Sequence, residues 1–363
     1  MSVLQHQRAL VVGGGIIGLT TARALQDRGL EVILKYIKSG DQTTSGGSGG
    51  YWMPFHAEGG AVSRWAETTL AKYQAEQPSP LIESLRAFSI FASDVAPATP
   101  DWGNGLAKME VINGRRALEE AMSATGVTLP EGYESAWAFE TVVVDSPKYC
   151  QELERLLVED GATVDARKIV TDLVAEAKLC EADVVVNCTG LNAATIATDD
   201  KAKMKPGRGV VLRFARPKNS HFKAVVTAED GPLATPTEPA YFIPRNDVVV
   251  VGGTYNEGVF NDVASPSEID RLKNVAATFA PDHFTVDPLA VWVGHRPVRT
   301  AGVRVELSPK DAPSRFIYDD QEPQVTVAHN YGHGGAGMTL AWGCADDIAD
   351  AIAGFRLKKR RRP

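Results

Sequence analysis

Cysteine and long apolar runs are both scarce in this chain of 363 residues. The four cysteines form no Cys-x-x-Cys pair, so the sequence predicts neither a disulfide framework nor a cysteine-rich zinc site. No stretch approaches the roughly 18 consecutive apolar residues of a membrane helix, so we predict no membrane span. The first eight residues contain no apolar segment typical of a secretory signal. We therefore expect an intracellular location, cytoplasmic or peroxisomal, although the C-terminus is not of the Ser-Lys-Leu type.

Basic residues are outnumbered by acidic ones, 38 to 45, which gives a formal net charge of −7. Five of the basic residues form one run near the C-terminus, Lys358–Arg362, so the rest of the chain is more acidic still. An acidic surface repels a phosphate backbone, so we do not expect a nucleic acid as the ligand. We interpret the basic tail, residues 358–363, as a solvated end rather than a localisation signal.

A glycine motif near the N-terminus predicts a dinucleotide-binding unit. The apolar run Ala9–Val12 is typical of a buried parallel strand, and Gly13-x-Gly15-x-x-Gly18 follows it. Residues 19–34 then have the pattern of a helix and a second strand. The first glycine permits a tight turn, the second lets a pyrophosphate approach the backbone, and the third lets helix and strand pack closely. Free N–H groups at the helix start favour the phosphate charge, which predicts a β-α-β unit of a doubly wound sheet.

One part of this fingerprint is absent. An acidic residue about 20 residues beyond the glycines usually binds the ribose hydroxyls. That place holds Lys35-Tyr36-Ile37-Lys38, and Asp41 lies a few residues further on. Two lysines there could instead bind the 2′-phosphate of NADP, so a NADP-dependent reductase stays open as an alternative.

Two further motifs suggest chemistry that their context does not support. Ser48 matches the Gly-x-Ser-x-Gly elbow of hydrolases, but residues 39–50 are rich in glycine, serine and threonine and are predicted to form a loop. A serine hydrolase or a non-catalytic protein is therefore only a remote alternative. His329 and His333 have helical metal spacing, yet the glycines around them oppose a helix, so we predict no metal site.

Arginine and tyrosine residues in two later segments suggest a carboxylate site. Arg296 precedes a proline, so its backbone should be extended, and Arg299 lies nearby. The guanidinium fork suits a carboxylate better than an ammonium does. Tyr241 lies in an apolar run. From the residues alone, surface ion pairs for the arginines and a core position for the tyrosine remain open.

Taken together, these segments resemble the FAD-dependent D-amino-acid oxidases, with the D-aspartate oxidases beside them. The resemblance covers nearly the whole chain in order, through residues 11–18, 43–45, 50–54, 187–190, 206–209, 240–244, 252–254, 294–299 and 329–339. The last two segments, Gly-His-Arg-Pro-Val-Arg and His-Asn-Tyr-Gly-His-Gly-Gly-Ala-Gly-Met-Thr, are specific, and chance does not readily produce both behind a dinucleotide fingerprint.

The resemblance implies that FAD is the cofactor and suggests its contacts. The glycine turn would hold the pyrophosphate, and Ile169 would contact the adenine end. Residues 334–339 would approach the pyrimidine side of the flavin. The implied cofactor residues are Gly13, Gly15, Ile16, Ile17, Gly18, Thr44, Ser45, Gly49, Gly50, Tyr51, Ile169, Thr189, Gly334, Gly335, Gly337, Met338 and Thr339.

The resemblance also implies three substrate contacts. Arg296 would grip the α-carboxylate, Tyr241 would share it, and the backbone carbonyl of Gly335 would accept the α-amine. The implied reaction is hydride transfer from Cα to FAD, followed by hydrolysis of the imino acid to a 2-oxo acid and ammonia, while O2 is reduced to H2O2. The cofactor supplies the chemistry and the protein supplies position, and a neutral amine needs no side-chain base.

Two pocket positions bear on the substrate side chain. Met53 stands where some relatives have a polar residue, and Tyr255 stands where D-aspartate oxidases place an arginine. A second carboxylate would need another cation, so we expect neutral, hydrophobic D-amino acids. A D-aspartate oxidase or another amine oxidase of the same fold remains the alternative. The lid segment, residues 221–239, lacks the tyrosine that some relatives carry there.

The expected fold class is α/β, with a Rossmann-like FAD-binding domain and a second substrate domain built on a mixed or antiparallel sheet. By the resemblance, residues 1–55, 145–205 and 310–357 form the discontinuous FAD-binding domain. Residues 56–144 and 206–309 form the substrate-binding domain. We also expect a homodimer that acts on a small D-amino acid and O2, without a nucleic acid or membrane partner.

Overall fold

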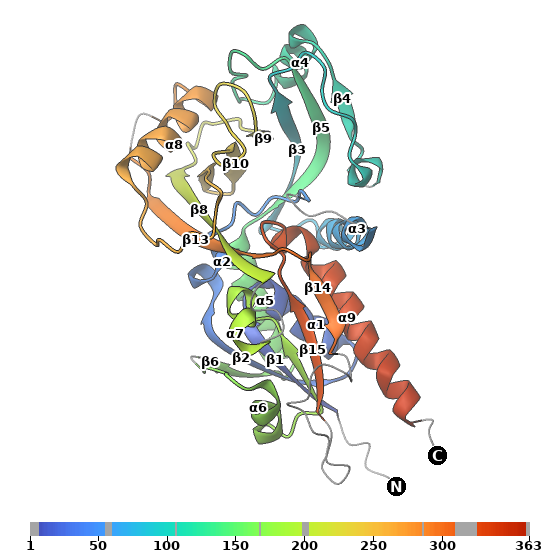
Figure 1. Ribbon diagram of the computed structural model, residues 1–363. Coiled ribbons are helices and arrows are strands. Elements are labelled where there is room, and N and C mark those ends of the chain that lie inside the picture. The colour runs from blue at the N-terminus through green and yellow to red at the C-terminus, as the bar shows by residue number, and fades with distance from the viewer. Residues whose placement is uncertain are drawn as a thin grey trace.

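The computed structural model describes residues 7–54, 60–105, 107–166, 168–197, 203–284, 287–308 and 325–360 (Figure 1). Helices are found at α1 (Ile16–Asp27), α2 (Thr44–Gly47), α3 (Gly60–Ala75), α4 (Arg115–Met122), α5 (Ser146–Glu159), α6 (Leu173–Leu179), α7 (Ala193–Ile196), α8 (Pro266–Phe279) and α9 (Gly337–Arg360). Strands are found at β1 (Arg8–Gly14), β2 (Glu31–Ser39), β3 (Ile82–Phe91), β4 (Glu110–Ile112), β5 (Ser135–Val144), β6 (Thr163–Ala166), β7 (Val184–Asn187), β8 (Met204–Ala215), β9 (Ala224–Ala228), β10 (Ala240–Arg245), β11 (Val248–Gly252), β12 (Asn256–Glu257), β13 (Ala290–Arg299), β14 (Arg304–Leu307) and β15 (Thr326–Tyr331).

The first sheet contains the predicted dinucleotide-binding unit and has the strand order β14-β15-β7-β1-β2-β6. β1 pairs in parallel with β2 and β7, and β7 pairs in parallel with β15. Leu10, Val11 and Val185 are fully shielded from solvent. Parallel strands covered on both faces need such unbroken apolar runs, which is why the run beginning at residue 9 forms the centre of the sheet. The helices α1 and α9 pack together beside this sheet (Figure 1).

The second sheet has the order β12-β8-β11-β10-β9-β3-β5-β4, and β13 also pairs along β8. Its pairs are antiparallel except for the parallel pair of β3 and β9, so the sheet is mixed. Its core contains Phe214, Phe242 and Phe279, the last of which comes from α8. The predicted fold class, a Rossmann-like sheet joined to a mixed second sheet, is therefore confirmed.

The division into two discontinuous domains stays a prediction. The two sheets outline it, since β1, β2, β6, β7 and β15 form the first sheet. β14 also lies in the first sheet, although we assigned residues 304–307 to the substrate domain. The boundaries at residues 55 and 310 fall outside the residues that the structure describes.

Residues 39–50 are more ordered than the predicted loop. β2 continues to Ser39, a 3-10 turn covers Gly40–Gln42, and α2 occupies Thr44–Gly47. Thr43 caps α2, because its hydroxyl accepts a hydrogen bond from the Gly46 N–H at 3.2 Å. The prediction of a loop was wrong here because this N-cap outweighs the low helix propensity of glycine.

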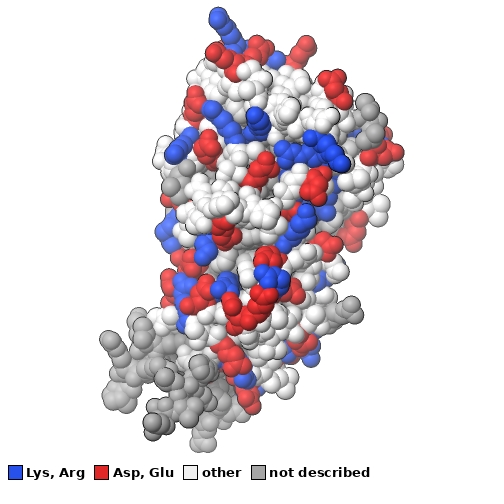
Figure 2. All heavy atoms as spheres, turned by 180° about the vertical axis from the view of Figure 1, so that it is seen from behind, with Lys and Arg blue, Asp and Glu red and all other residues white. Residues whose placement is uncertain are grey.

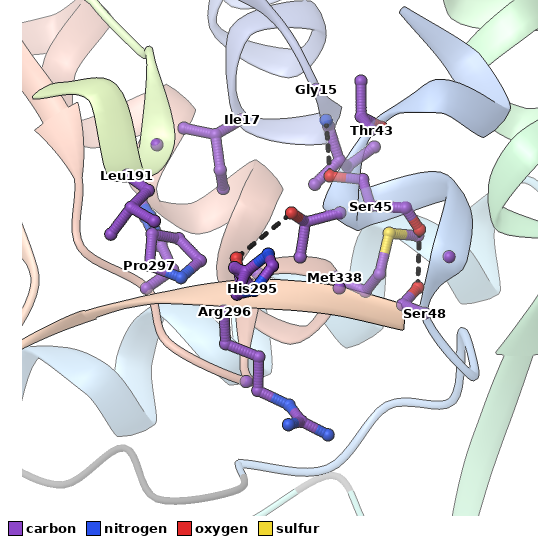
Figure 3. Close-up of a pocket in the computed structure, with 18 of the residues that line it drawn as sticks. Gly15, Ile17, Thr43, Ser45, Ser48, Leu191, His295, Arg296, Pro297 and Met338 are labelled. Atoms are coloured by element: carbon purple, nitrogen blue, oxygen red, sulfur yellow. Dashed lines mark hydrogen bonds between the residues drawn. The ribbon is translucent and has the colours of Figure 1, made fainter. Parts of the chain in front are cut away.

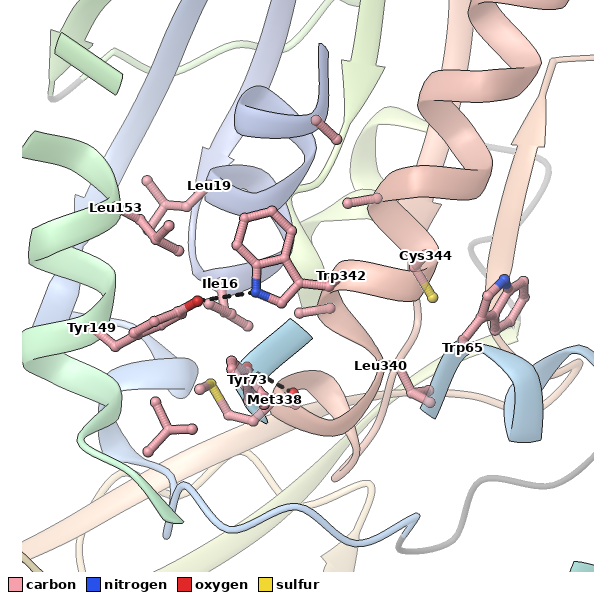
Figure 4. Packing of buried hydrophobic residues seen from close by; sticks show 14 of the residues in the cluster. Ile16, Leu19, Trp65, Tyr73, Tyr149, Leu153, Met338, Leu340, Trp342 and Cys344 are labelled. Carbon is pink, nitrogen blue, oxygen red and sulfur yellow. Dashed lines mark hydrogen bonds between the residues drawn. The ribbon is translucent and has the colours of Figure 1, made fainter. Parts of the chain in front are cut away.

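The C-terminal helix α9 runs from Gly337 to Arg360 and so extends into the basic run. The first part of the interpreted tail thus continues the helix, while residues 361–363 lie outside the described residues. Near its start, α9 packs against α1, α3 and α5, where Trp342 donates to the Tyr149 hydroxyl at 3.0 Å (Figure 4).

Charged side chains of both signs are intermingled over one face of the molecule (Figure 2). Surface ion pairs contribute to this pattern, for example Arg64 with Asp347 at 2.6 Å. Among the described residues, no helix combines the length and apolar character that crossing a membrane requires.

Candidate functional site

A cavity of about 680 Å³ lies at the carboxyl ends of β1, β7 and β15. Residues after β1 and β7 form one wall, and residues of β10 and β13 from the second sheet form another. Ligands of open α/β sheets bind at this edge, because the strand ends and the helix N-termini converge there. The cavity is therefore the candidate site, and residues of both sheets line it.

The glycine turn forms a cradle, an open space that side chains at these positions would fill. A Cβ at Gly13 would lie 2.3 Å from the Cys188 carbonyl oxygen, and Gly13 has a φ of +130°. A Cβ at Gly18 would lie 1.9 Å from the Gly13 carbonyl oxygen. Gly15 is the N-cap of α1, and the Ile16 N–H donates to the Ser45 hydroxyl at 3.0 Å. A backbone turn against a helix N-terminus with no acidic first turn fits the pyrophosphate of a dinucleotide.

A second wall of this cradle comes from α2 and the loop after it. The Thr44 hydroxyl donates to the His295 carbonyl at 3.2 Å, which joins α2 to β13 (Figure 3). A Cβ at Gly47 would lie 2.0 Å from the Trp292 ring, and one at Gly49 would lie 2.4 Å from Ile243. These glycines are required because the loop passes directly over the second sheet.

Two arginines that we did not assign from the sequence hold this loop. Arg213 of β8 donates to the Gly46 carbonyl at 2.8 Å. Arg245 of β10 donates to the Ser48 carbonyl at 3.0 Å and to the Ser146 hydroxyl at 3.1 Å. Burial lowers the pKa of Arg245 to about 10 and also lowers that of Arg213, yet both remain cations at neutral pH. The available signal was an arginine inside an otherwise apolar strand, since arginine is seldom buried without a partner.

Lys35 does not face the cavity. It is buried and donates to Glu176 at 2.6 Å, and it lies 3.2 Å from Asp165. Burial opposes its charge, but these carboxylates outweigh burial and raise the pKa of the Lys35 ammonium. The NADP alternative therefore loses one of its two lysines. Lys38 lines the cavity at the end of β2.

The carboxylate-binding candidates lie at the other end of the cavity. Arg296 points from β13 to the side opposite the glycine turn (Figure 3). Its Nη1 donates to the Thr254 carbonyl at 3.0 Å, and its guanidinium lies 5.6 Å from the Tyr255 ring centre. A Cβ at Gly209 would lie 2.4 Å from the same Nη1, so this glycine makes room for the arginine.

Tyr241 is partly buried at this end of the cavity. Burial raises the pKa of its hydroxyl, and the adjacent Arg296 acts in the opposite direction. A neutral phenol beside a cation is suited to hold a carboxylate. Arg299 instead donates to the carbonyls of Ala301 and Gly302, at 3.1 and 2.9 Å.

Most residues assigned by the resemblance line this one cavity. They are Gly13, Gly15, Ile16, Ile17, Thr44, Ser45, Gly49, Gly50, Tyr51, Met53, Ile169, Thr189, Tyr241, Arg296, Gly334, Gly335, Gly337 and Met338. Gly18, Tyr255 and Thr339 are not among the lining residues. Thr339 supports the lining, because its hydroxyl donates to the Met53 carbonyl at 2.8 Å.

The geometry does not favour His333 as a catalytic base or Ser48 as a nucleophile. His333 lines the cavity and is buried, and desolvation lowers its pKa to about 3. It is therefore neutral at physiological pH and too weak a base to accept a substrate proton. The Ser48 hydroxyl donates to the Ser45 carbonyl at 2.7 Å rather than to a histidine. Within the described part of the chain, no cluster of three or more His, Cys, Asp or Glu residues could hold a metal ion.

The chain is similar in sequence and in fold to known proteins over nearly its whole length. Residues 8–351 match the sequence profile of the family described as FAD dependent oxidoreductase (DAO). The chain is 32% identical to a D-amino-acid oxidase of Streptomyces coelicolor, over 94% of this chain and 95% of that protein. It is 31% identical to a D-amino-acid oxidase of Rubrobacter xylanophilus, over 96% and 97% of the two chains. Its fold resembles the glycine oxidase of Bacillus cereus, with a TM-score of 0.74, 17% identity, and coverage of 97% and 96%.

Proposed function

Because the chain belongs to the FAD dependent oxidoreductase (DAO) family, we propose that it catalyses the oxidative deamination of D-amino acids. As a member of this family it depends on FAD. We further propose that neutral, hydrophobic D-amino acids are substrates, that O2 is the electron acceptor and that H2O2 is released. The products from the amino acid would be a 2-oxo acid and ammonia.

The observation that carries this proposal is one cavity with a dinucleotide cradle at one end and Arg296 with Tyr241 at the other. The Gly13–Ile16 turn would hold the pyrophosphate, and α2 with the 334–338 segment would surround the flavin. When bound, FAD would supply the acceptor for the hydride of the substrate Cα. The fit rests on glycines at which a Cβ would lie within 2.4 Å of a neighbouring atom, such as Gly13, Gly47 and Gly49.

The protein's own residues position the substrate. Arg296 would bind the α-carboxylate through its guanidinium, and the Tyr241 hydroxyl would donate to the same group. The Gly335 carbonyl would accept from the α-amine, so that three contacts fix the direction of the Cα hydrogen. With His333 neutral and too weak a base, the amine would enter as the free base rather than lose its proton to a side chain.

The test is an anaerobic visible spectrum of the purified protein, before and after adding D-valine, with L-valine as the control. We expect a yellow protein that D-valine bleaches and L-valine does not. A yellow protein bleached by neither would contradict the neutral D-amino acid as substrate, and D-aspartate would be tested next. A protein that stays colourless after adding FAD would contradict the whole proposal.

The D-aspartate alternative needs a second cation beside the substrate. Arg296 is the single arginine among the described residues that line the cavity. Tyr255, whose ring is close to the Arg296 guanidinium, occupies the position at which D-aspartate oxidases place a further arginine. Arg271 is close in space, but it donates to the Pro239 carbonyl at 3.4 Å and to the Gly253 carbonyl. The geometry thus favours a side chain without a second carboxylate.

The cell location and the oligomeric state also remain proposals. All four cysteines are free, which agrees with a reducing, cytoplasmic or peroxisomal location. Microscopy of a fluorescent fusion would test this, and secretion would contradict it. We propose a homodimer from the family resemblance, and sedimentation of the holoenzyme would reveal a monomer if this is wrong.

A further inference from the structure

The loop after α2 passes over the face of β10 that carries Tyr241. A Cβ at Gly49 would lie 2.4 Å from the Ile243 side chain, so the loop and the strand are in direct contact there. Ile243 and Tyr241 are two residues apart within β10, so their side chains point to the same face of the sheet. Both of them line the cavity, as does Tyr51, which follows two residues after Gly49. The loop therefore brings Tyr51 to the substrate end of the cavity.

The backbone of Tyr51 is fixed to β5. Tyr51 and Val143 form an antiparallel bridge, and the Trp52 N–H donates to the Val142 carbonyl at 2.9 Å. Because contacts on two consecutive residues hold the backbone, the Tyr51 ring starts from a fixed position.

The hydroxyl of Tyr51 lies beside residues of the substrate end. It donates to the Met53 sulfur at 2.7 Å. Burial raises the pKa of this hydroxyl, and the nearby Thr227 hydroxyl acts in the opposite direction. Thr227 pairs with Tyr241 across β9 and β10, and the Cβ atoms of such a pair are about 5 Å apart. The Tyr51 phenol therefore borders the space beside the Tyr241 ring, and it is uncharged at neutral pH.

The neighbouring Met53 is held in place as well. Its N–H donates to the Thr339 hydroxyl at 3.2 Å, and its carbonyl accepts from the same hydroxyl at 2.8 Å. A methionine side chain normally adapts to its surroundings because it is flexible. The hydrogen bond from Tyr51 restricts this side chain, so the two residues form one rigid wall. A closely packed wall excludes ligands that are too large rather than yielding to them.

We propose that Tyr51 determines substrate specificity by limiting the size of the side chain, so that D-alanine and D-valine are accepted and D-tryptophan is excluded. This inference rests on the proposed function and narrows its substrate class. It adds a second role to the cofactor contact that the resemblance implied for Tyr51. Arg296 and Tyr241 would hold the carboxylate of every substrate, and the Tyr51 phenol would decide which side chains fit beside it.

The experiment compares a large and a small substrate on one enzyme sample. We would measure kcat/KM for D-tryptophan and for D-alanine, with the FAD-loaded wild-type protein and with FAD-loaded Tyr51→Ala. Because both substrates are measured on the same sample, loss of folded or FAD-loaded protein cancels in the ratio of the two values. If Tyr51→Ala does not retain FAD, Tyr51→Leu removes the ring while keeping an apolar side chain and gives the same comparison.

We expect the ratio of D-tryptophan to D-alanine to rise at least tenfold in Tyr51→Ala, because the excluded side chain would gain the space of the phenol. Tyr51→Phe keeps the ring, so its ratio should stay close to the wild-type value. A ratio in Tyr51→Phe that equals the one in Tyr51→Ala would contradict a limit set by size.

Leu191→Ala is the matched control. Leu191 also lines the cavity, but it follows β7 and lies beside Pro297, away from the direction in which Arg296 points (Figure 3). The variant therefore removes apolar bulk from another wall of the same cavity. We expect its ratio to equal that of the wild type, and a rise as large as in Tyr51→Ala would overturn the specific role of Tyr51.

Two outcomes would separate this inference from the proposed function. Turnover of D-alanine with a ratio that Tyr51→Ala leaves unaltered would overturn the role of Tyr51 and keep the oxidase. Absence of flavin reduction by every D-amino acid, small or large, would overturn the proposed function itself.

Discussion

At the scale of single residues, the candidate site depends on where each polar group finds a partner. Arg296 and Arg299 are three residues apart on β13, yet only Arg296 lines the cavity. Arg299 donates to backbone carbonyls in the following turn. A one-residue change in strand position reverses the face of a side chain, so neighbouring arginines of one strand can have unrelated roles.

Replacing Arg296 tests the carboxylate site. Arg296→Ala should lower kcat/KM for a neutral D-amino acid at least a hundredfold, because a substrate carboxylate would lose its charged partner, an effect of about 3 kcal/mol or more. Arg296→Lys should recover only part of this, since an ammonium cannot form the paired contact. Arg299→Ala is the control, and equal losses in both variants would contradict the assignment. Steady-state oxygen consumption provides the measurement.

His333 should make stability depend on pH in a defined direction. Its pKa is about 3 in the folded protein and 6.5 in an unfolded chain, so below pH 6.5 the unfolded chain binds the additional proton. Its contribution is complete above pH 6.5 and is lost as the pH falls, by about 1.4 kcal/mol per unit. Urea unfolding of the apoprotein at pH 7 and pH 5 should show a smaller pH effect in His333→Asn than in wild type. An equal effect in both proteins would show that His333 is not buried as the structure has it.

At the scale of elements, the cofactor loop is held from the opposite sheet. α2 and the residues after it contain glycines that allow close packing over Trp292 and Ile243. Glycine also leaves the backbone free to move, so the loop needs external constraints. Arg213 and Arg245 supply them by donating to the carbonyls of Gly46 and Ser48.

Removing one of these constraints should weaken FAD binding. Arg245→Gln would lose hydrogen bonds from a charged donor, each worth about 1.5 kcal/mol or more, and we expect at least a tenfold higher Kd for FAD. Arg216→Gln is a matched control, since Arg216 follows β8 and donates to the Phe222 and Asn246 carbonyls, at 2.7 and 3.4 Å, rather than to the Gly46–Ser48 loop. Titration of apoprotein by flavin fluorescence gives both values. Similar Kd values for the two variants would contradict the role of Arg245.

At the scale of the whole molecule, neither sheet forms the site alone. The first sheet supplies the glycine turn and the ends of β7 and β15, while the second supplies Tyr241 and Arg296. A ligand that binds both walls should stabilise the folded protein as a unit. The relation between ligand concentration and stability gives about 2.7 kcal/mol at a hundred times Kd.

Thermal unfolding distinguishes the two cofactor hypotheses. FAD added to apoprotein at a hundred times its Kd should raise the melting temperature by several degrees. NADP at the same concentration should leave it unchanged, because Lys35 is occupied by Glu176 and Asp165. A rise with NADP that equals the rise with FAD would revive the reductase alternative.

Much of the dinucleotide unit was accessible from the sequence because its rules are local. An apolar run, the Gly-x-Gly-x-x-Gly motif and a following helix pattern are enough to specify strand, turn and helix start. The loop over residues 39–50 was misjudged for a local reason too, since composition was considered without the cap at Thr43. The domain boundaries could not be derived this way, because they depend on which sheet each strand joins.

The sequence by itself determined the glycine cradle, the buried β1 strand and, through the resemblance, the identity of the FAD-dependent family. Only the tertiary structure decided that Lys35 faces away from the cavity and that Arg213 and Arg245 hold the Gly46–Ser48 loop. The physical reason is the distance along the chain, since these partners are 141 to 197 residues apart. Strand register and sheet packing bring them together, and no local pattern encodes that approach.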